Sequence, residues 1–239
     1  MKGFLVALQF LTRLPGPRMS VSAAEFAGSM CWFPAVGLVV GGIVAGGAWA
    51  GARIDLWVGA LAGLLLWVGV TGALHLDGLG DVFDAAGAGH KDPDRIRAVL
   101  SDPHIGSFGV VAIGAQLLAK LVLLHAVIEA GALVPLLLTP AVARIGPLVW
   151  ARGLPNLHDG LASRFRDAVG IGTLGLWAAM LIAGALLAPA MLACVLLFPL
   201  WGLWLRRHIG GISGDGHGAG IEVVESGLLF AILVWERTL

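Results

Sequence analysis

Three aspartates recur at helical spacing in the segment His75-Leu-Asp77-Gly-Leu-Gly-Asp81-Val-Phe-Asp84. The spacing i, i+4, i+7 predicts that the three carboxylates share one face of a helix, within an arc of roughly 60°. Like charges on one face repel each other, so the arrangement favours a bound cation. Carboxylate oxygens suit Mg²⁺ or Mn²⁺ rather than zinc, and such an ion typically also binds substrate phosphates. We therefore predict that Asp77, Asp81 and Asp84 bind Mg²⁺ and do chemistry on a phosphorylated substrate. A solvated acidic helix end and a cation pathway are the alternatives.

A second polar segment runs from Asp94 to Gly109. Arg95 and Arg97 are candidate phosphate ligands, because guanidinium groups bind phosphate oxygens in a bidentate manner. Asp102 precedes the glycine-rich entry to an apolar run. It is a candidate to complete the metal site or to accept a proton from an attacking hydroxyl group.

A third segment, 210–220, contains six glycines within eleven residues. This composition predicts a loop whose amides can approach an anion and which leads into a helix N-terminus. Gly211, Ser213, Gly214 and Asp215 are the candidate substrate-binding residues of this loop, and a flexible linker is the alternative. His217 is predicted to be a hydrogen-bonding or structural residue rather than a metal ligand.

The elements that position these segments are predicted to be membrane helices. The chain has 239 residues, of which 58% are hydrophobic and 13% charged, and its mean hydropathy is +0.91. A soluble domain usually has about 25% charged residues, so most of this surface does not face water. The net charge is zero, which argues against nucleic acid as a partner. Cys31 and Cys194 lie far apart in apolar runs and are predicted to be buried thiols.

A spanning helix needs about 20 mostly apolar residues. Residues 1–239 are predicted to form a single all-α membrane domain with about seven spans: 27–50, 56–75, 105–128, 132–151, 171–188, 190–205 and 221–236. Six spans and one re-entrant segment are the alternative.

The distribution of basic residues predicts the orientation of these spans. With the N-terminus in the cytoplasm, eleven basic residues lie on the cytoplasmic side: Lys2, Arg13, Arg18, Lys91, Arg95, Arg97, Arg152, Arg164, Arg166, Arg206 and Arg207. The other side has only Arg53 and Arg237, while Lys120 and Arg144 fall within spans, where they either pair with buried acids or reach a polyanionic substrate. The same orientation predicts that eleven acids lie on or near the cytoplasmic face: Asp77, Asp81, Asp84, Asp92, Asp94, Asp102, Asp159, Asp167, Asp215, Glu222 and Glu225.

Five ordered motifs, spread over the whole chain, carry a resemblance to a known family. They are Phe10-Leu-Thr-Arg13-Leu-Pro15-Gly-Pro17, Phe33-Pro34, His75-Leu-Asp77-Gly-Leu-Gly-Asp81-Val-Phe-Asp84, Asp102-Pro-His-Ile-Gly106-Ser-Phe-Gly109 and Gly210-Gly-Ile-Ser-Gly-Asp215. This series resembles the cobalamin synthase family, adenosylcobinamide-GDP ribazoletransferase.

The resemblance implies an Mg²⁺-dependent enzyme of the bacterial inner membrane with its active site facing the cytoplasm. Such an enzyme joins adenosylcobinamide-GDP to α-ribazole, or to α-ribazole 5′-phosphate, and releases GMP. The family's acidic signature falls on Asp77, Asp81 and Asp84, and its other motifs carry Asp102 and Asp215. Arg13 and His75 join the candidate substrate-binding residues. His104 is a departure from the family pattern, which often has Arg there. The sequence leaves a homo-oligomer open.

Two rival functions remain at this stage. A CDP-alcohol phosphotransferase also begins an acidic helix with Asp-Gly, but it continues with Ala-Arg where this chain has Gly80-Asp81. An ion-coupled transporter requires acids near the bilayer midplane on discontinuous helices, whereas the acids here are predicted to gather at one face.

Overall fold

The computed structural model describes residues 2–88, 92–157 and 161–238, apart from the side chains of residues 161–163. Lys91 and Asp159, assigned above to the cytoplasmic face, lie outside the described residues. In the described part of the chain every regular element is helical, and the only β-type pairing is an isolated bridge between Asn156 and Ile212. The predicted all-α fold is therefore confirmed.

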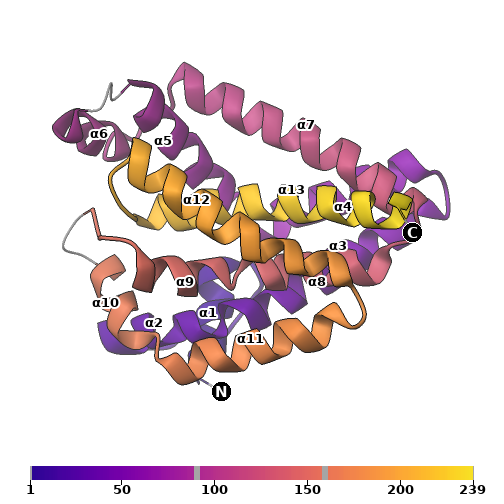
Figure 1. The fold of residues 1–239 in the computed structure, drawn as a ribbon, viewed down its shortest axis with the longest axis horizontal. Helices are drawn as coiled ribbons and strands as arrows, with labels where there is room; N and C mark the ends of the chain where they lie inside the picture. The colour runs from indigo at the N-terminus through magenta and orange to yellow at the C-terminus, as the bar shows by residue number, and fades with distance from the viewer. Residues whose placement is uncertain (1, 89–91, 158–160, 239) are drawn as a thin grey trace.

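The first half of the chain contains helices α1 (Lys2–Leu11), α2 (Ala23–Ser29), η1 (Met30–Trp32), α3 (Phe33–Ala52), α4 (Leu56–Thr71), α5 (Leu74–Ala88), α6 (Pro93–Leu100) and α7 (Ser107–Glu129). The second half contains α8 (Leu133–Ala143), α9 (Gly146–Gly153), α10 (Leu161–Ala168), α11 (Ile171–Ala185), η2 (Pro189–Ala193), α12 (Cys194–His208) and α13 (Gly214–Thr238). The long helices run back and forth along the longest axis of the molecule (Figure 1).

The number of helices that can cross a membrane is slightly lower than predicted. In the described residues, five helical segments are long and apolar enough: Ala23–Ala52, Ser107–Glu129, Leu133–Gly153, Pro189–His208 and Gly214–Thr238. The bent pair α4–α5 makes a sixth if it is counted as one span. α11 has 15 residues, which at about 1.5 Å per residue fall short of a bilayer core of about 30 Å. The chain is thus a multi-pass membrane protein with five or six spans by this criterion.

A sharp bend between α4 and α5 interrupts the predicted span 56–75. Gly72 and Ala73 have φ angles of 61° and 59°, in the left-handed region, and the two helices meet at 84°. Glycine adopts this conformation without steric cost, and a β-carbon on Gly72 would meet the Arg13 side chain, which would have to move. The bend turns α5 away from the direction of α4, so that α5 packs against a different helix.

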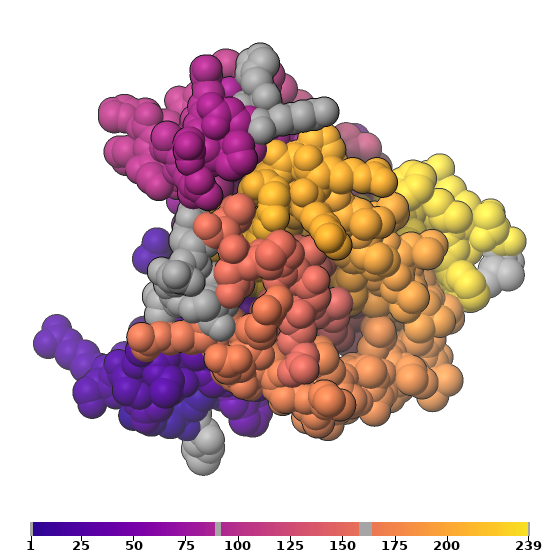
Figure 2. All heavy atoms as spheres, turned by 60° about the vertical axis from the view of Figure 1, so that its left-hand side comes forward, coloured from indigo at the N-terminus to yellow at the C-terminus, as the bar shows by residue number. Residues whose placement is uncertain are grey.

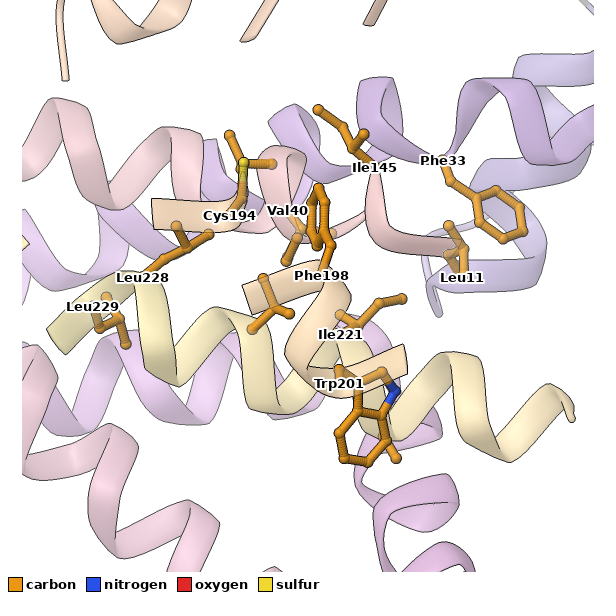
Figure 3. Close-up of a cluster of buried hydrophobic side chains, with 14 of the residues drawn as sticks. Leu11, Phe33, Val40, Ile145, Cys194, Phe198, Trp201, Ile221, Leu228 and Leu229 are labelled. Atoms are coloured by element: carbon orange, nitrogen blue, oxygen red, sulfur yellow. The ribbon is translucent and has the colours of Figure 1, made fainter. Parts of the chain in front are cut away.

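That partner is α13, which lies in the centre of the molecule and also contacts α7, α8 and α12. Figure 3 shows its side chains Ile221, Leu228 and Leu229 packed among Phe198 and Trp201 of α12 and residues of the N-terminal helices. Close helix approach also holds α3 against α8, because Gly37 and Gly41 leave no room for a β-carbon beside the α8 backbone. Small residues at helix contacts are typical of membrane proteins.

One end of the molecule gathers the segments singled out in the sequence. The α5–α6 corner, the start of α7 and the start of α13 all lie at the left of Figure 1, opposite the C-terminus. The fold therefore brings residues from distant motifs to one end of the bundle.

Candidate active site

Helix α5 carries all three aspartates of the first motif, as predicted. They differ in burial: Asp77 is exposed, Asp81 is half-buried and Asp84 is buried. Burial of these carboxylates therefore increases along α5, from Asp77 at the surface to Asp84 in the protein interior.

Asp84 binds backbone amides. Its two carboxylate oxygens accept hydrogen bonds from the amides of Gly106 (2.7 Å) and Gly109 (2.8 Å). Gly106 is the N-cap of α7 and Gly109 lies in its first turn, where the helix dipole favours a negative charge. A β-carbon on either glycine would overlap the Asp84 carboxylate. Asp84 therefore fastens α5 to the start of α7, a role that the sequence did not suggest.

Asp215, at the start of α13, lies close to the acids of α5. A β-carbon on Gly78 would lie 2.9 Å from the Asp215 Cα and carbonyl oxygen, so the two helices touch at this point. The charges that act on Asp81 come from Asp215, Asp77 and Asp84, with Asp215 the strongest. The acidic group at the surface is thus Asp77, Asp81 and Asp215, from two helices, and we call it the carboxylate site.

The segment before Asp215 is built differently from the predicted loop. The backbone of Ile212 pairs with Pro155 and Leu157 through hydrogen bonds of 2.8 and 3.1 Å. The Ser213 hydroxyl oxygen accepts a hydrogen bond from the Gly216 amide and so caps α13. The helix begins at Gly214, so the prediction of a loop through residue 220 and a span beginning at 221 is wrong.

Gly211 and Ser213 are buried, whereas Gly214 is exposed and Asp215 half-buried. A β-carbon on Gly211 would overlap the Pro155 carbonyl oxygen, which gives this glycine a packing role. Gly214 and Asp215 are the two candidates of this segment that reach a pocket.

This pocket, which we call the α5–α13 pocket, has a volume of about 170 Å³. Its polar lining includes Asp77, Asp215, His75 and His217, and its apolar lining comes from α1, α3, α9 and α13: Phe10, Leu11, Phe33, Pro147 and Ile221. Figure 2 turns this end of the molecule toward the reader, with the α5–α6 segments above and the α1–α2 segments below. Polar groups thus stand beside a small apolar chamber.

A metal ion is compatible with the carboxylate site, but the structure holds no complete set of ligands for it. Among the described residues, no three His, Cys, Asp or Glu side chains are close enough to bind one metal ion. Mg²⁺ usually keeps several waters and binds proteins through one or two carboxylates together with substrate phosphates. The oxygen donors of Asp77, Asp81 and Asp215 match that chemistry. The Mg²⁺ ion and its ligands therefore stay predictions.

Other predicted site residues lie around this centre. Arg13 is exposed and its side chain lies against Gly72 at the α4–α5 bend. Arg95 is exposed on α6, where Arg97 pairs with Asp94 at 2.5 Å. No contact joins Arg95 to the carboxylate site in the described part of the chain.

Asp102 is exposed, and its described contacts are local. Its carboxylate accepts a hydrogen bond from the His104 amide at 3.0 Å and lies 2.7 Å from His104 Nδ1. The hydrogen bonds from the His104 side chain and backbone lower the pKa of Asp102. A lowered pKa makes a carboxylate a weaker base, which argues against Asp102 as the proton acceptor.

Beneath the pocket lies a buried ionic network, which we define as Lys120, Arg144, Glu222 and Glu225. Lys120 Nζ lies 2.7 Å from Glu222 and 2.6 Å from Glu225, and Arg144 Nη1 lies 2.9 Å from Glu225. The two basic residues therefore pair with buried acids, the first of the two alternatives given above. Glu222 and Glu225, which were predicted on or near the cytoplasmic face, are buried two to three turns inside α13, about 12–16 Å from its start.

The sequence did not predict the partners in this network or the position of His217. Glu222 and Glu225 stand three residues apart in an otherwise apolar helix, and Lys120 and Arg144 lie in apolar runs. Buried charges need partners, so the match of two acids to two bases was the available signal. His217 gave no comparable signal, because its pocket is formed only when α5, α9 and α13 pack together.

Together these features define a multi-pass α-helical membrane protein with a carboxylate-lined pocket at one end of its bundle. Residues 3–233 match the family model described as cobalamin-5-phosphate synthase. The chain belongs to this family.

Relatives over the full length agree with this assignment. The chain is 60% identical over 245 residues to adenosylcobinamide-GDP ribazoletransferase of Novosphingobium aromaticivorans, with 100% of both chains covered. It is 47% identical over 234 residues to the protein of the same name from Thiobacillus denitrificans, covering 96% of this chain and 94% of the relative. The protein of that name from Brevibacillus brevis is 31% identical over 242 residues, with 98% of both chains covered. No solved structure gives a significant match.

Proposed function

We propose that this protein is an adenosylcobinamide-GDP ribazoletransferase. It joins adenosylcobinamide-GDP to α-ribazole or its 5′-phosphate, releases GMP and forms adenosylcobalamin or its 5′-phosphate. The full-length match to relatives of that name supports the assignment, and the observation that carries it is the family match over residues 3–233. Asp77 of α5 and Asp215 of α13, which two of the family motifs contribute, line one pocket, and this supports a reaction at a pyrophosphate.

The reaction is a phosphoryl transfer. The 3′-hydroxyl oxygen of α-ribazole attacks the phosphorus next to cobinamide in line, and the bond from this phosphorus to the GMP phosphate oxygen breaks. The hydroxyl proton passes to a carboxylate, and Asp77 is suited to accept it because it is exposed and lines the pocket. Positioning and charge stabilisation supply most of the catalysis in such reactions.

Asp81 and Asp215 would hold Mg²⁺, which would neutralise the pyrophosphate charge and leave Asp77 to accept the proton. Asp84 fixes α5 relative to α7 and so keeps Asp81 in place. Arg13 would bind phosphate oxygens, and its exposed side chain beside Gly72 at the bend that begins α5 supports this role.

We place the enzyme in the bacterial inner membrane with the carboxylate site facing the cytoplasm. The excess of Lys and Arg in the loops on that side supports this orientation. Both substrates are polar and phosphorylated, so the site must open to water.

The direct test uses the purified full chain in lipid nanodiscs with adenosylcobinamide-GDP, α-ribazole 5′-phosphate and Mg²⁺. We expect GMP and the joined product in equal amounts, and loss of both on adding EDTA. A second arm supplies a CDP-activated lipid with glycerol or inositol, and we expect no CMP. Absence of GMP in the first arm, or CMP release in the second, would overturn the assignment.

A further inference from the structure

Helix α11 lies at the lower edge of the molecule in Figure 1 and has an apolar groove beside it. α11 packs against η2 but not closely against α3 or α8, and the groove lies between these helices. Its volume is about 270 Å³, and the described residues that line it are all apolar. Along the chain of α11 it runs from Trp177 to Leu187, about 15 Å at 1.5 Å per residue. This length equals one leaflet, half of a bilayer core of about 30 Å.

The surroundings of α11 indicate what fills this groove. α11 has no buried residue, and the large apolar side chains that it exposes include Leu176, Ile182 and Leu186. These side chains face lipid in a multi-pass membrane protein. An empty apolar groove is unfavourable because its lining loses dispersion contacts. An acyl chain is the component of the bilayer that matches the groove in length and in chemistry.

A polar cavity lies at the end of α11 that we place at the cytoplasmic face. Arg152 at the end of α9, together with Arg166 and Asp167 of α10, lines this open cavity of about 530 Å³. All three side chains are exposed, and Asp167 lies four residues before Ile171, where α11 begins. The cavity is therefore placed at the level where lipid headgroups meet water.

Backbone carbonyls hold the two guanidinium groups in place. Arg152 Nη1 donates a hydrogen bond to the Val169 carbonyl oxygen at 2.6 Å. Arg166 donates to the carbonyl oxygens of Leu154 (2.8 Å) and Ala151 (3.4 Å). Each guanidinium has five N–H donors, so most of them remain for a ligand. Neither arginine forms an ion pair with an acid in the part of the chain that the structure describes, and phosphate is a ligand that such groups bind well.

One face of α9 connects the groove to the cavity. Ile145, the N-cap residue of α9, lines the groove, and Arg152 lines the cavity. The two residues are seven positions apart, so they lie on the same face of the helix, about 10 Å from each other along its axis. Val149 lies between them on this face and is 39% exposed. An elongated ligand can therefore lie along α9 with an anionic group in the cavity and an apolar tail in the groove.

We propose that this surface binds one anionic phospholipid, with its phosphodiester at Arg152 and Arg166 and an acyl chain in the groove beside α11. The side chains of Arg152, Arg166 and Asp167 carry a net charge of +1, which matches the single negative charge of phosphatidylglycerol and not the zwitterion phosphatidylcholine. The lipid fills the space that separates α11 from α3 and α8. The groove and the cavity share no lining residue with the α5–α13 pocket, so the proposal does not depend on the proposed function.

The test measures which lipids the protein retains. The full chain is reconstituted in nanodiscs that contain equal amounts of palmitoyl-oleoyl phosphatidylglycerol and palmitoyl-oleoyl phosphatidylcholine, and native mass spectrometry counts the lipids that stay bound after release. Because the two lipids have the same chains, their ratio reports the headgroup. The ratio is read on folded protein, so it does not depend on the folded fraction. We expect the wild type to retain phosphatidylglycerol about tenfold more, because basic residues at the membrane surface attract anionic lipids.

The headgroup end is tested by the double variant Arg152→Gln with Arg166→Gln. It should retain the two lipids equally, because the cavity then carries no positive side chain. The matched control is Arg206→Gln with Arg207→Gln, at a basic pair in the last turn of α12. This control removes the same number of positive charges and should keep the preference of the wild type.

The groove is tested by Gly184→Leu. Gly184 lines the groove, and a β-carbon there would lie 3.8 Å from Leu138 of α8, so the new side chain occupies the space of the acyl chain. Retention of both lipids should fall several-fold. Gly175→Leu is the control on the same helix, at a position where nothing lies within 4 Å of a β-carbon, and it should retain lipid as the wild type does.

Equal retention of the two lipids by the wild type would overturn the proposal, and so would a preference that survives in Arg152→Gln with Arg166→Gln. Lipid retention that is the same in Gly184→Leu and Gly175→Leu would show that no acyl chain occupies the groove. A raised KM for either substrate in the double arginine variant, with the lipid ratio of the wild type, would instead assign the two arginines to substrate binding. GMP release by the wild type is measured separately, so the failure of the proposed function would be distinguishable from all of these results.

Discussion

The carboxylate site and the buried ionic network handle negative charge in opposite ways. In the network, Glu222 and Glu225 lie against Lys120 and Arg144 at 2.6–2.9 Å, and the charges sum to zero. At the carboxylate site, Asp77 and Asp81 have no ion pair with a basic residue in the described part of the chain. The same helix, α13, contributes acids to both.

This comparison distinguishes charged residues that stabilise the fold from charged residues that are available for binding and chemistry. Ion pairs inside a membrane protein are needed because an unpaired charge there is expensive. Asp77 and Asp81 lie one turn apart on α5 and repel each other, and neither has an ion pair with a basic residue in the described part of the chain, so a cation from outside would balance them. We therefore assign stability to the network and chemistry to the carboxylate site, and substitutions in the two regions should separate these effects.

The largest effect on activity is expected from Asp81→Asn. This variant removes one charge from the carboxylate site while preserving shape, and GMP release should fall at least about a thousandfold, because charge stabilisation supplies most of the rate enhancement. Membrane insertion and the unfolding temperature should be unchanged. Asp94→Asn is the control, at an exposed acid on α6, and full activity in Asp81→Asn would refute the assignment.

The largest effect on stability is expected from Glu225→Gln. The variant leaves Lys120 and Arg144 with one carboxylate between them, and removing one partner of a buried ion pair costs about 3–5 kcal/mol. The unfolding midpoint in detergent should drop by several degrees. A midpoint equal to wild type would show that the network does not hold α13 in place.

Gly78→Ala tests the contact that joins the two halves of the carboxylate site. The new methyl group would lie 2.9 Å from the Asp215 backbone, so α5 and α13 must separate. Displacements of about 1 Å can cost about a hundredfold in rate, and we expect a loss of about 10–100-fold in kcat. Gly114→Ala on α7, where nothing lies within 4 Å, should be neutral, and equal activity in the two variants would contradict the close approach.

Asp102→Asn should have the smallest effect. Asp102 is exposed and bonded to His104, outside the group of charges that act on Asp81. We expect kcat to fall less than tenfold, measured as GMP release at saturating substrates. A loss as large as that of Asp81→Asn would show that the loop before α7 closes over the substrate and brings Asp102 into the reaction.

The sequence predicted the α5 helix and its three acids because i, i+4, i+7 spacing is a local property. It did not predict that Asp84 would turn to the amides of α7, or that Asp215 would join Asp77 and Asp81. Both depend on contacts between segments far apart in the chain. The ends of the predicted spans failed for the same reason at the α4–α5 bend, where Gly72 adopts a left-handed conformation.

The glycine-rich segment 210–220 shows how local propensity can mislead. Glycine disfavours helices, yet α13 begins at Gly214. Gly218 lies against the His75 backbone, where a β-carbon would be 3.3 Å away, and Gly220 leaves room for the indole rings of Trp150 and Trp201. These glycines allow close packing, and the packing compensates for their low helix propensity.

The most direct test of the account is the binding of Mn²⁺, as a paramagnetic substitute for Mg²⁺, to the full chain in nanodiscs, followed by electron paramagnetic resonance. We predict saturable binding that Asp81→Asn and Asp215→Asn weaken at least tenfold and that Glu225→Gln and Asp94→Asn leave unchanged. Binding that is equal in the wild type and Asp81→Asn would contradict the claim that the acids of α5 and α13 form a cation site.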